Sequence, residues 1–584
     1  MVYKIADNIW SPLGTTTKAN YQAVKSEHTA LSSAPSRWGT TELSTAAVFS
    51  DAQNEELMIP SLTRFESLVV RSVQQALQDV ALDASNEEVV FVLSTTKANV
   101  GLLGEADTPP EILYPGESAR RICAFLDITT TPIVVCNACI SGLSAVILAS
   151  RLIESGQYRH AIVCGADVLN RFILSGFQSL KALSETPCRP FDMERLGMNL
   201  GEAAATMILS AEPCDKEKTW VIGAGAIRND AYHISTPSNK AEGATKALQA
   251  ILKDADISQL AVVNAHGTGT MFMDQMESVA IAKTGLADIP VNSYKGYYGH
   301  TLGAAGVLET VLTMQALDDH TIIGTRGFKE LGVSGQLKLS PEHQPTDKTS
   351  FVKIISGFGG GNAGIIISGQ WRVDSFDYFF RQELGLQRNH NCPLSTVHSP
   401  LSSVRITPDS VTIDGKPLAC QGHGKELLTA LYKQYVGDYP KFYKMDMLCR
   451  LGFIASELLE KSDADTAVVL FNHSSSIHAD RAYLETISEG EVNGQWSMVN
   501  VFPSPSLFVY TLPNIVAGEI AIRHQYHGES SFYILPEHDE RLMRQIQAAT
   551  FADPAIDNMI TGWLDYEDDD HFLADLYLLS KPLQ

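Results

Sequence analysis

The chain has few basic residues: 44 Lys and Arg stand against 67 Asp and Glu among 584 residues, which gives a formal net charge of −23. No long Lys/Arg cluster interrupts this acidic background, which argues against nucleic acid or an anionic membrane as a partner. No stretch approaches the roughly 18 uncharged apolar residues of a membrane-spanning helix. The segment from Met1 to Gly14 lacks the apolar core and cleavage site of a signal peptide, so we expect a cytoplasmic protein.

Paired cysteine motifs are also missing. The nine cysteines include no two Cys-x-x-Cys pairs, and most of them lie in apolar runs. An odd number of cysteines, with no second Cys-x-x-Cys pair to accompany Cys136 and Cys139, argues against a disulfide framework and against a structural zinc site. We therefore predict reduced thiols and no metal centre.

What the chain does contain is an alternation of strand-like and helix-like segments over residues 1–370. Continuous apolar strands that alternate with helices predict parallel sheets covered on both faces. The scheme occurs twice, so we predict a duplicated α/β fold with halves at 1–211 and 212–370. The apolar, β-branched segments begin near residues 88, 132, 160, 220, 261, 290, 351 and 364.

Cys139 stands where an apolar strand is predicted to end and a helix to begin, within Val135-Cys-Asn-Ala-Cys-Ile-Ser-Gly142. At a helix start a thiolate faces unpaired backbone N–H groups and the positive end of the helix dipole, and both lower its pKa. Taken alone, Cys139 is also compatible with a buried, inert thiol.

Two histidines occupy comparable places. His266 follows an apolar strand and precedes the turn Gly-Thr-Gly-Thr270, and His300 stands just before a helix rich in small residues. Sites in open α/β sheets assemble at strand ends, and a cysteine with a histidine is a nucleophile with its activating partner. We therefore predict one site made by Cys139, His266 and His300.

Further motifs accompany these three residues, and together they resemble the β-ketoacyl-acyl-carrier-protein synthases, elongating condensing enzymes of the thiolase-like fold. The resemblance covers nearly all of residues 1–370, and it implies a duplicated α/β/α/β/α layered architecture. Two departures are mild: Ile140 and Gly361 stand where the family usually has a small residue and a threonine. The accompanying motifs are Arg189-Pro-Phe-Asp192, Gly201-Glu202-Ala-Ala204, Asp274-x-x-Glu277, Lys295-Gly296, Gly299-His-Thr301 and Gly357-Phe-Gly-Gly-Gly-Asn362.

The resemblance implies a decarboxylative Claisen condensation. Cys139 would hold an acyl chain as a thioester, and malonyl-acyl-carrier protein would lose CO2 and attack it. His266 and His300 would donate hydrogen bonds to the malonyl thioester oxygen. The backbone N–H groups of Cys139 and Phe358 would form a second oxyanion site, and Phe358 would gate the acyl pocket.

The resemblance also assigns supporting roles. Thr268 and Thr270 would hydrogen-bond the phosphopantetheine arm, on which acyl carrier protein brings the substrates. Lys295 and Glu277 would form a buried ion pair that orients the histidines. No metal or redox cofactor is required. The product would be β-ketoacyl-acyl-carrier protein in fatty acid or polyene and polyketide-type biosynthesis.

Two other interpretations stay open. Chain-length factors resemble synthases but lack the nucleophile, so Cys139 argues against a non-catalytic partner subunit of that kind. A cysteine acyltransferase on the same fold would need only the thiol and one histidine. Relatives that start chains carry an asparagine, and thiolases a second cysteine, where this chain has His300, which favours elongation.

The remaining chain is predicted to be a linker, residues 371–400, and a non-catalytic domain, residues 401–584. The tail resembles a truncated, degenerate copy of the synthase N-terminal half, that is, a smaller thiolase-like α/β domain. The segment Ser531-Phe-Tyr-Ile-Leu-Pro-Glu-His538 stands in the place of the cysteine segment and has no cysteine. Tyr439 to Lys444 is a candidate contact surface.

Partners follow from the family as well. Synthases pair across a central sheet, so we expect a homodimer or a heterodimer with a ketosynthase-like subunit. Acyl carrier protein is acidic and needs a basic docking patch, for which Lys181, Arg189 and Arg195 are the candidates.

Overall fold

The computed structural model describes residues 1–34, 44–214, 218–371, 400–487, 490–492, 495–497 and 503–581. Apart from its two ends, the predicted linker 371–400 lies outside these residues. Within the described ranges, no helix combines the length and the apolar character that crossing a bilayer requires.

Residues 1–370 contain two five-stranded units with the same order and the same strand directions, which confirms the duplicated α/β fold. The central strand of each unit, β4 or β10, is parallel to both neighbours, and the last two strands continue the sheet antiparallel. The first unit runs β5 (Ile133–Val135), β4 (Val89–Ser94), β6 (His160–Asp167), β8 (Ala203–Ser210), β1 (Val2–Trp10). The second runs β11 (Pro290–Asn292), β10 (Leu260–Asn264), β15 (Ser350–Ser356), β16 (Gly361–Trp371), β9 (Lys218–Asn229).

The sheets are therefore mixed, and the prediction of parallel sheets was wrong for these outer strands. Strands β15 and β16 are joined only by the loop of residues 357–360, which is too short for a crossover helix, so they must pair antiparallel. Strands β1 and β9 also pair antiparallel and join the two units.

Helices cover both faces of each unit. Helices α5 (Ser141–Glu154) and α10 (Ala305–Asp318) lie between the two sheets and are buried on almost every side. They are apolar nearly all round, as a helix without a solvent face should be. The outer layers contain α3 (Arg64–Leu77) and α4 (Pro115–Phe125) on one side, and α7 (Glu242–Leu252) and α8 (Met271–Lys283) on the other.

Glycines allow the two central helices to meet at their N-terminal ends. A Cβ on Gly142 would lie 2.8 Å from the Gly303 carbonyl oxygen, and one on Gly306 would lie 2.2 Å from the Leu143 nitrogen. Larger residues would force these backbones apart. The close approach brings the segments that contain Cys139 and His300 side by side.

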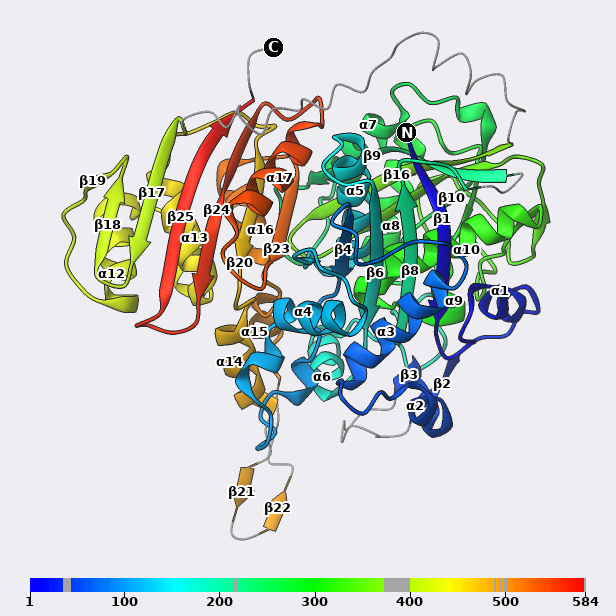
Figure 1. Ribbon diagram of the computed structural model, residues 1–584, viewed down its shortest axis with the longest axis horizontal. Coiled ribbons are helices and arrows are strands. Elements are labelled where there is room, and N and C mark those ends of the chain that lie inside the picture. The colour runs from blue at the N-terminus through cyan, green and yellow to red at the C-terminus, as the bar shows by residue number, and fades with distance from the viewer. Residues whose placement is uncertain are drawn as a thin grey trace.

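The tail contains a third five-stranded unit with the order and directions of the other two. Its strand β23 pairs antiparallel with β5, with Tyr533 opposite Val135 and Ile534 opposite Val134, so one sheet continues from the first unit into the tail (Figure 1). The tail unit runs β23 (Ser530–Ile534), β20 (Ala467–Asn472), β24 (Asn558–Tyr566), β25 (Phe572–Ser580), β17 (Ser402–Thr407), with β18 (Ser410–Ile413) beside β17.

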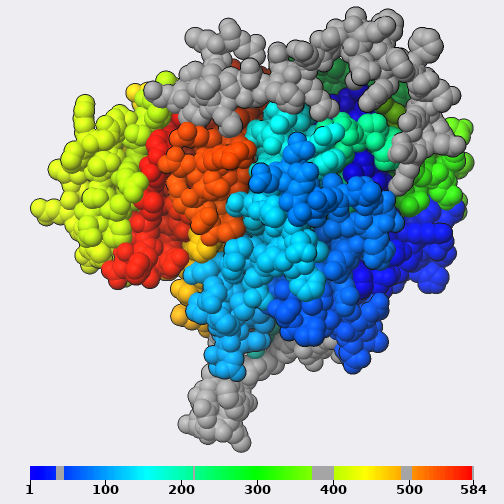
Figure 2. Space-filling view, viewed as in Figure 1, coloured from blue at the N-terminus to red at the C-terminus, as the bar shows by residue number. Residues whose placement is uncertain are grey.

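Tail helices repeat the layering on a smaller scale. Helices α13 (Met447–Leu458) and α16 (Ile515–His524) pack on one face of the tail sheet, while α17 (Glu540–Phe551) packs against α5. Two more, α14 (Ile477–Ile487) and α15 (Pro505–Tyr510), lie beside α6 (Arg171–Ser179) of the first half of the chain. In the space-filling view the orange and red residues of the tail lie directly against the blue and cyan residues of the first unit on the face shown (Figure 2).

Buried ion pairs connect the tail to residues 1–370. Arg151 on α5 pairs with Glu529 at 2.7 Å, and Arg228 on β9 pairs with Asp553 at 2.8 Å. All four side chains are at least nine-tenths buried. Removing one partner of such a pair leaves an uncompensated charge in the interior, so the two parts are built to stay together.

Candidate active site

The cysteine segment forms a sharp turn between strand and helix. Strand β5 ends at Val135, a short 3₁₀ turn covers Ala138–Ile140, and α5 begins at Ser141. Ala138 has a φ of 49°, a left-handed conformation that a non-glycine residue rarely adopts and that is common at functional sites. Cys139 follows directly and is buried, with 9% of its surface exposed.

The structure brings the three predicted residues together. The Cys139 sulfur and one ring nitrogen of each of His266 and His300 lie within 4.8 Å of one another. The two imidazole rings meet edge to face, with centroids 5.0 Å apart. A sulfur and two ring nitrogens could also hold a soft divalent ion such as Zn²⁺.

Both histidines are neutral at physiological pH. Burial, and then the charge of Lys295, holds the pKa of each ring well below its usual 6.5. The Leu302 N–H donates to His300 Nδ1 at 3.2 Å, so the ring proton is on Nε2. Among the described residues this Nε2 has no hydrogen-bond partner. His300 therefore presents a free donor to the site.

The thiol is less acidic than its helix-start position predicts. Burial raises the pKa of Cys139 to about 12, although Lys295 and the backbone N–H groups of Cys139 and Phe358 act in the opposite direction. The prediction of a lowered pKa was wrong because it counted the donors and ignored desolvation. The geometry behind the prediction is nevertheless present, since both N–H groups approach the sulfur.

The predicted ion pair between Lys295 and Glu277 is also wrong. Lys295 pairs with Glu309 on α10, and Lys353 on β15 binds the other oxygen of Glu309 at 2.5 Å. All three side chains are almost completely buried. Burial alone would raise the pKa of Glu309, but the two lysines hold it below its usual value.

Sequence reasoning missed Glu309 and Lys353. Each is a charged residue inside an otherwise apolar element, Lys353 in the strand Phe351-Val-Lys-Ile-Ile355 and Glu309 in the helix that follows Gly306. A charge in such a place is buried only when it is paired. That anomaly is the signal that could have identified them.

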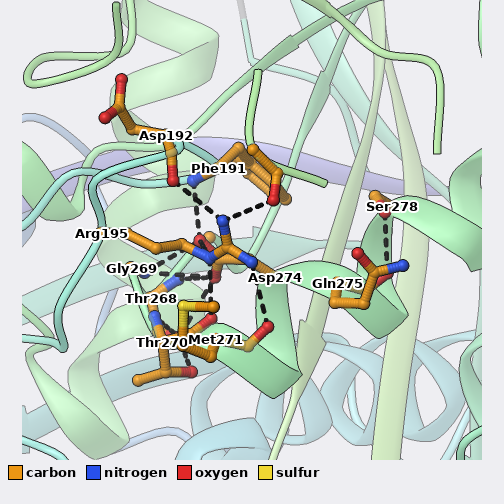
Figure 3. Close-up of polar contacts among 12 residues, drawn as sticks. Phe191, Asp192, Arg195, Thr268, Gly269, Thr270, Met271, Asp274, Gln275 and Ser278 are labelled. Carbon is orange, nitrogen blue, oxygen red and sulfur yellow. Dashed lines mark hydrogen bonds and ion pairs between the residues drawn. The ribbon is translucent and has the colours of Figure 1, made fainter. Parts of the chain in front are cut away.

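Glu277 and Asp274 hold the backbone of the His266 loop. Glu277 accepts hydrogen bonds from the His266 and Gly267 N–H groups at 2.6 and 2.8 Å. Asp274 accepts from the Thr268 N–H at 2.9 Å and from the Gly269 N–H at 3.1 Å (Figure 3). The Asp-x-x-Glu motif of α8 thus fixes the turn after β10.

Arg195 is excluded as a docking residue because it is 3% exposed. Its guanidinium donates to the carbonyl oxygens of Asp192 at 2.8 Å and Gly332 at 2.7 Å, and to that of Met271 at 3.1 Å (Figure 3). Arg189 is partly exposed but pairs with Asp192 and Glu194. Lys181 is exposed.

The two predicted pantetheine contacts are adjacent. The hydroxyl groups of Thr268 and Thr270 lie 2.9 Å apart. Thr268 is buried and also binds Asp274, whereas Thr270 is partly exposed. Thr270 is thus the more accessible of the two to a ligand.

An apolar cavity adjoins Cys139, and the tail supplies part of its wall. Its volume is about 20 Å³, little more than one water molecule needs. The ring of Phe177 lies 6.2 Å from that of Phe358 and 5.4 Å from that of Phe508, between centroids. The lining consists of Thr96, Lys97, Ala138, Cys139, Ile173, Phe177, Leu302 and Phe358 from residues 1–370, with Phe508 and Leu512 from the tail.

The charge of Lys97 at this cavity is neutralised by the tail. Its ammonium donates to Asp480 on α14, to the Ser476 hydroxyl at 3.1 Å and to the Thr511 carbonyl oxygen. Lys97 and Asp480 are both more than nine-tenths buried. The tail thus removes an unpaired charge from the wall of an apolar site.

Comparison with known proteins identifies the family to which residues 1–370 belong, and these residues are called the synthase region from here on. Residues 5–213 match the family described as "Beta-ketoacyl synthase, N-terminal domain", and residues 220–329 match "Beta-ketoacyl synthase, C-terminal domain". The 3-oxoacyl-[acyl-carrier-protein] synthase 2 of Coxiella burnetii is 34% identical over 260 residues, which are 41% of this chain and 63% of that protein. The enzyme of the same name from Staphylococcus aureus strain N315 is 30% identical over 339 residues, 52% of this chain and 81% of that protein.

Two solved structures that resemble this chain differ in how much of it they match. The ketosynthase ApeO in complex with its chain length factor ApeC from Xenorhabdus doucetiae is 26% identical, with a TM-score of 0.54, over 63% of this chain and 97% of that one. The PfaC keto synthase–chain length factor has a TM-score of 0.70 over 97% of this chain and 74% of that one. At 14% identity the second likeness shows the fold alone, but that fold includes the tail.

Proposed function

We propose that this chain, which belongs to the β-ketoacyl synthase family, condenses an acyl group held on Cys139 with malonyl-acyl-carrier protein. The product is β-ketoacyl-acyl-carrier protein for fatty acid or polyketide-type biosynthesis. The observation that carries the proposal is one buried thiol with two neutral imidazoles, all within 4.8 Å.

The first step is acyl transfer. The Cys139 sulfur attacks the thioester carbon of acyl carrier protein, a new C–S bond forms, the old one breaks, and the proton of Cys139 ends on the departing pantetheine thiol. Negative charge develops on the carbonyl oxygen in the transition state. The N–H groups of Cys139 and Phe358, which approach the sulfur, support the assignment of an oxyanion site there.

The second step needs donors for a second oxyanion. Malonyl carrier protein loses CO2, and the electron pair of the broken C–C bond forms an enolate whose oxygen accepts from His266 and His300. The enolate carbon then attacks the Cys139 thioester, and the enolate oxygen becomes the carbonyl of the product thioester. The sulfur leaves as a thiolate and takes up a proton from the solvent. Burial first, and then the charges of Lys295 and Lys353, hold the histidine pKa values down, and the same positive charges favour the enolate.

Thr268 and Thr270 are proposed to hydrogen-bond the pantetheine arm, and Phe358 to gate the cavity. A cavity of about 20 Å³ has no room for an acyl chain, so a side chain must move before Cys139 is acylated. Phe358 is our candidate for the side chain that moves, because it lies in the glycine-rich loop.

The eight cysteines among the described residues are free thiols, which fits a reducing cytoplasm.

We propose that residues 401–584 are a non-catalytic third copy of the synthase half. The tail repeats not only the strands but also a polar contact: Thr96 after β4 donates to Asp167 at the end of β6, and Ser474 after β20 donates to Asp565 near the end of β24. Between β23 and α17, where the first copy has its cysteine, stand Pro536, Glu537 and His538.

The tail takes the place that the resemblance assigned to a second subunit. Strand β23 occupies the edge of β5, so the sheet pairing expected between subunits is made within one chain. The likeness to the PfaC keto synthase–chain length factor, which extends over 97% of this chain, supports this interpretation. Acyl carrier protein then remains as the transient partner.

Product analysis tests the condensation and separates the alternatives. The full chain is incubated with acyl- and malonyl-carrier protein, and the products are identified by mass spectrometry. A β-ketoacyl product two carbons longer is expected. Transfer of the acyl group without elongation would indicate a cysteine acyltransferase, and absence of any acyl-enzyme would indicate a non-catalytic subunit.

His300→Ala is expected to slow decarboxylation more than acyl loading. Loss of one oxyanion donor costs about 10²–10³ in rate, and the free Nε2–H of His300 is such a donor. Release of CO2 from malonyl carrier protein is compared with the rate of Cys139 acylation in single turnover. Loss of acylation with intact CO2 release would reverse the assignment.

Phe508→Ala is expected to lengthen the acyl chains that the site accepts. The ring of Phe508 fills a space above Gly176, where a Cβ would lie 2.1 Å from it, and it borders the Cys139 cavity. Each buried methylene contributes about 0.8 kcal/mol, so kcat/KM for chains two methylenes longer should rise about tenfold. Competition between acyl-carrier substrates of graded length measures this.

Phe508→Leu removes less volume than Phe508→Ala, so it provides a second test if Phe508→Ala does not fold. Phe442→Leu is the matched control, because Phe442 is a buried tail aromatic that stacks on Tyr432 and does not border the cavity. It should lower stability without changing chain length. Equal chain-length profiles for Phe508→Leu, Phe508→Ala and wild type would contradict the prediction.

A further inference from the structure

The loop that contains Phe358 is held by the tail as well as by the synthase region. The Phe358 N–H approaches the Cys139 sulfur. On the other side of the same residue, the Phe358 carbonyl oxygen accepts a hydrogen bond from Asn514 Nδ2 at 2.8 Å. Asn514 belongs to the tail, directly before α16. One tail side chain is therefore bound to the residue that supplies an oxyanion donor.

The side chain of Asn514 does not stabilise the start of its own helix. It is the N-cap residue of α16, yet its side chain makes no capping hydrogen bond. Asparagine is favoured at this position because its side-chain oxygen accepts from the first helical N–H groups. Here Oδ1 has no partner among the described residues, and the amide nitrogen binds the Phe358 carbonyl instead.

Backbone contacts press α16 against the same loop. A Cβ on Gly518 would lie 2.6 Å from the Gly359 carbonyl oxygen, and a Cβ on Gly359, whose φ is +87°, would lie 2.7 Å from Asn514 Nδ2. Only glycine at both positions permits this approach. The fit depends on the tail being in place.

The synthase region holds the peptide groups on both sides of Gly359. The Gly359 N–H donates to the Ile234 carbonyl oxygen at 2.7 Å, and Asn229 Nδ2 donates to the Gly359 carbonyl oxygen at 2.8 Å. Asn514 completes this set by holding the carbonyl of Phe358 itself. Fixing that carbonyl limits rotation about the Phe358 Cα bonds and therefore the direction of its N–H.

We propose that Asn514 is a positioning residue for acyl transfer: the tail aims the Phe358 N–H at the oxyanion that forms when Cys139 is acylated. The inference rests on the proposed function, because it concerns the same thioester chemistry. Asn514 itself does not border the Cys139 cavity. The tail is thus required for the reactivity of the site, beyond shaping its wall.

Two reactions of the same sulfur distinguish positioning from a general structural role. Acylation by a thioester passes through a tetrahedral adduct whose oxygen needs donors. Alkylation by iodoacetamide displaces iodide from carbon and forms no oxyanion at the carbonyl. A misdirected Phe358 N–H should slow acylation and spare alkylation.

The test uses the full-length chain with Asn514→Asp, which keeps the shape but lacks the donor, and with Asn514→Ala. We expect single-turnover acylation of Cys139 by acyl-carrier protein to fall about 10- to 100-fold, within the range for loss of one oxyanion donor. The rate of Cys139 alkylation by iodoacetamide, followed by mass spectrometry, should fall much less than the acylation rate, because the Phe358 N–H is the last of the groups that lower the thiol pKa. Asn514→Gln, which keeps an amide donor, should recover part of the acylation rate.

Gln525→Glu is the matched control, because Gln525 at the other end of α16 donates to the Ala231 carbonyl oxygen of the synthase region at 3.1 Å and does not contact the loop. It should acylate like wild type. Wild-type acylation in Asn514→Asp and Asn514→Ala would overturn the inference, and so would an equal fall in alkylation. A wild-type enzyme that acylates Cys139 but never elongates would instead overturn the proposed function and leave this test valid.

Discussion

Cys139→Ala is expected to abolish elongation, with a fall in rate on the order of 10⁵–10⁶, as when the nucleophile of a catalytic triad is removed. Cys139 is the thiol that lies beside both imidazoles, and the acyl chain has no other attachment point in the proposed mechanism. Incubation with acyl-carrier protein, followed by intact-mass and peptide mass spectrometry, should show one acyl adduct, on Cys139, and none in the variant.

The other thiols supply the controls. Cys136 and Cys164 are completely buried, burial raises the pKa of each to about 12, and in the described part of the chain the cluster with His266 and His300 contains neither of them. Cys164→Ala should therefore load and extend chains at close to the wild-type rate. An acyl adduct that persists in Cys139→Ala, on whichever residue, would remove the basis of the proposed mechanism.

Glu309→Gln is expected to reduce stability and activity together. It would leave Lys295 and Lys353 as buried cations with no carboxylate between them, and breaking a buried pair from one side costs about 3–5 kcal/mol. Urea unfolding measures the loss of free energy, and CO2 release measures the effect on the histidines, whose pKa values depend on these charges.

Glu277→Gln tests the corrected pairing. Glu277 binds two backbone N–H groups rather than an ammonium, and burial raises its pKa to about 7, so a neutral side chain there is a smaller change. We expect it to destabilise the protein less than Glu309→Gln does. The opposite order of the two variants would show that Glu277 is the more important counter-charge.

Features that depend on neighbours along the chain could be predicted from the sequence. The duplicated strand–helix alternation follows from hydrophobic periodicity, which records burial residue by residue. The position of Cys139 at a strand-to-helix junction and those of His266 and His300 beside glycines follow from local motifs. Because the parallel strands β10 and β11 end at one edge of the second sheet, local facts were sufficient to bring His266 and His300 together. Cys139 belongs to the first unit, and the close packing of α5 against the start of α10 brings it to them.

Choices between residues far apart in the chain were decided only by the tertiary structure. Glu277 and Glu309 both lie on helices near Lys295 in sequence, and only the packing of α10 puts Glu309 against it. The pKa of Cys139 depends on how completely other elements exclude water from it, which no local pattern states. Arg195 could be counted as basic from the sequence, but its burial could not be known.

The role of the tail shows the same division. Its own alternation of strands and helices predicts a further α/β unit, and the missing cysteine predicts that it lacks the nucleophile. That β23 extends the sheet at β5, that Phe508 borders the Cys139 cavity, and that Asn514 holds the Phe358 carbonyl are contacts between residues more than 150 positions apart. Such contacts form because the edge of β5 and the apolar wall of the site must be covered, and the sequence alone does not say by which segment.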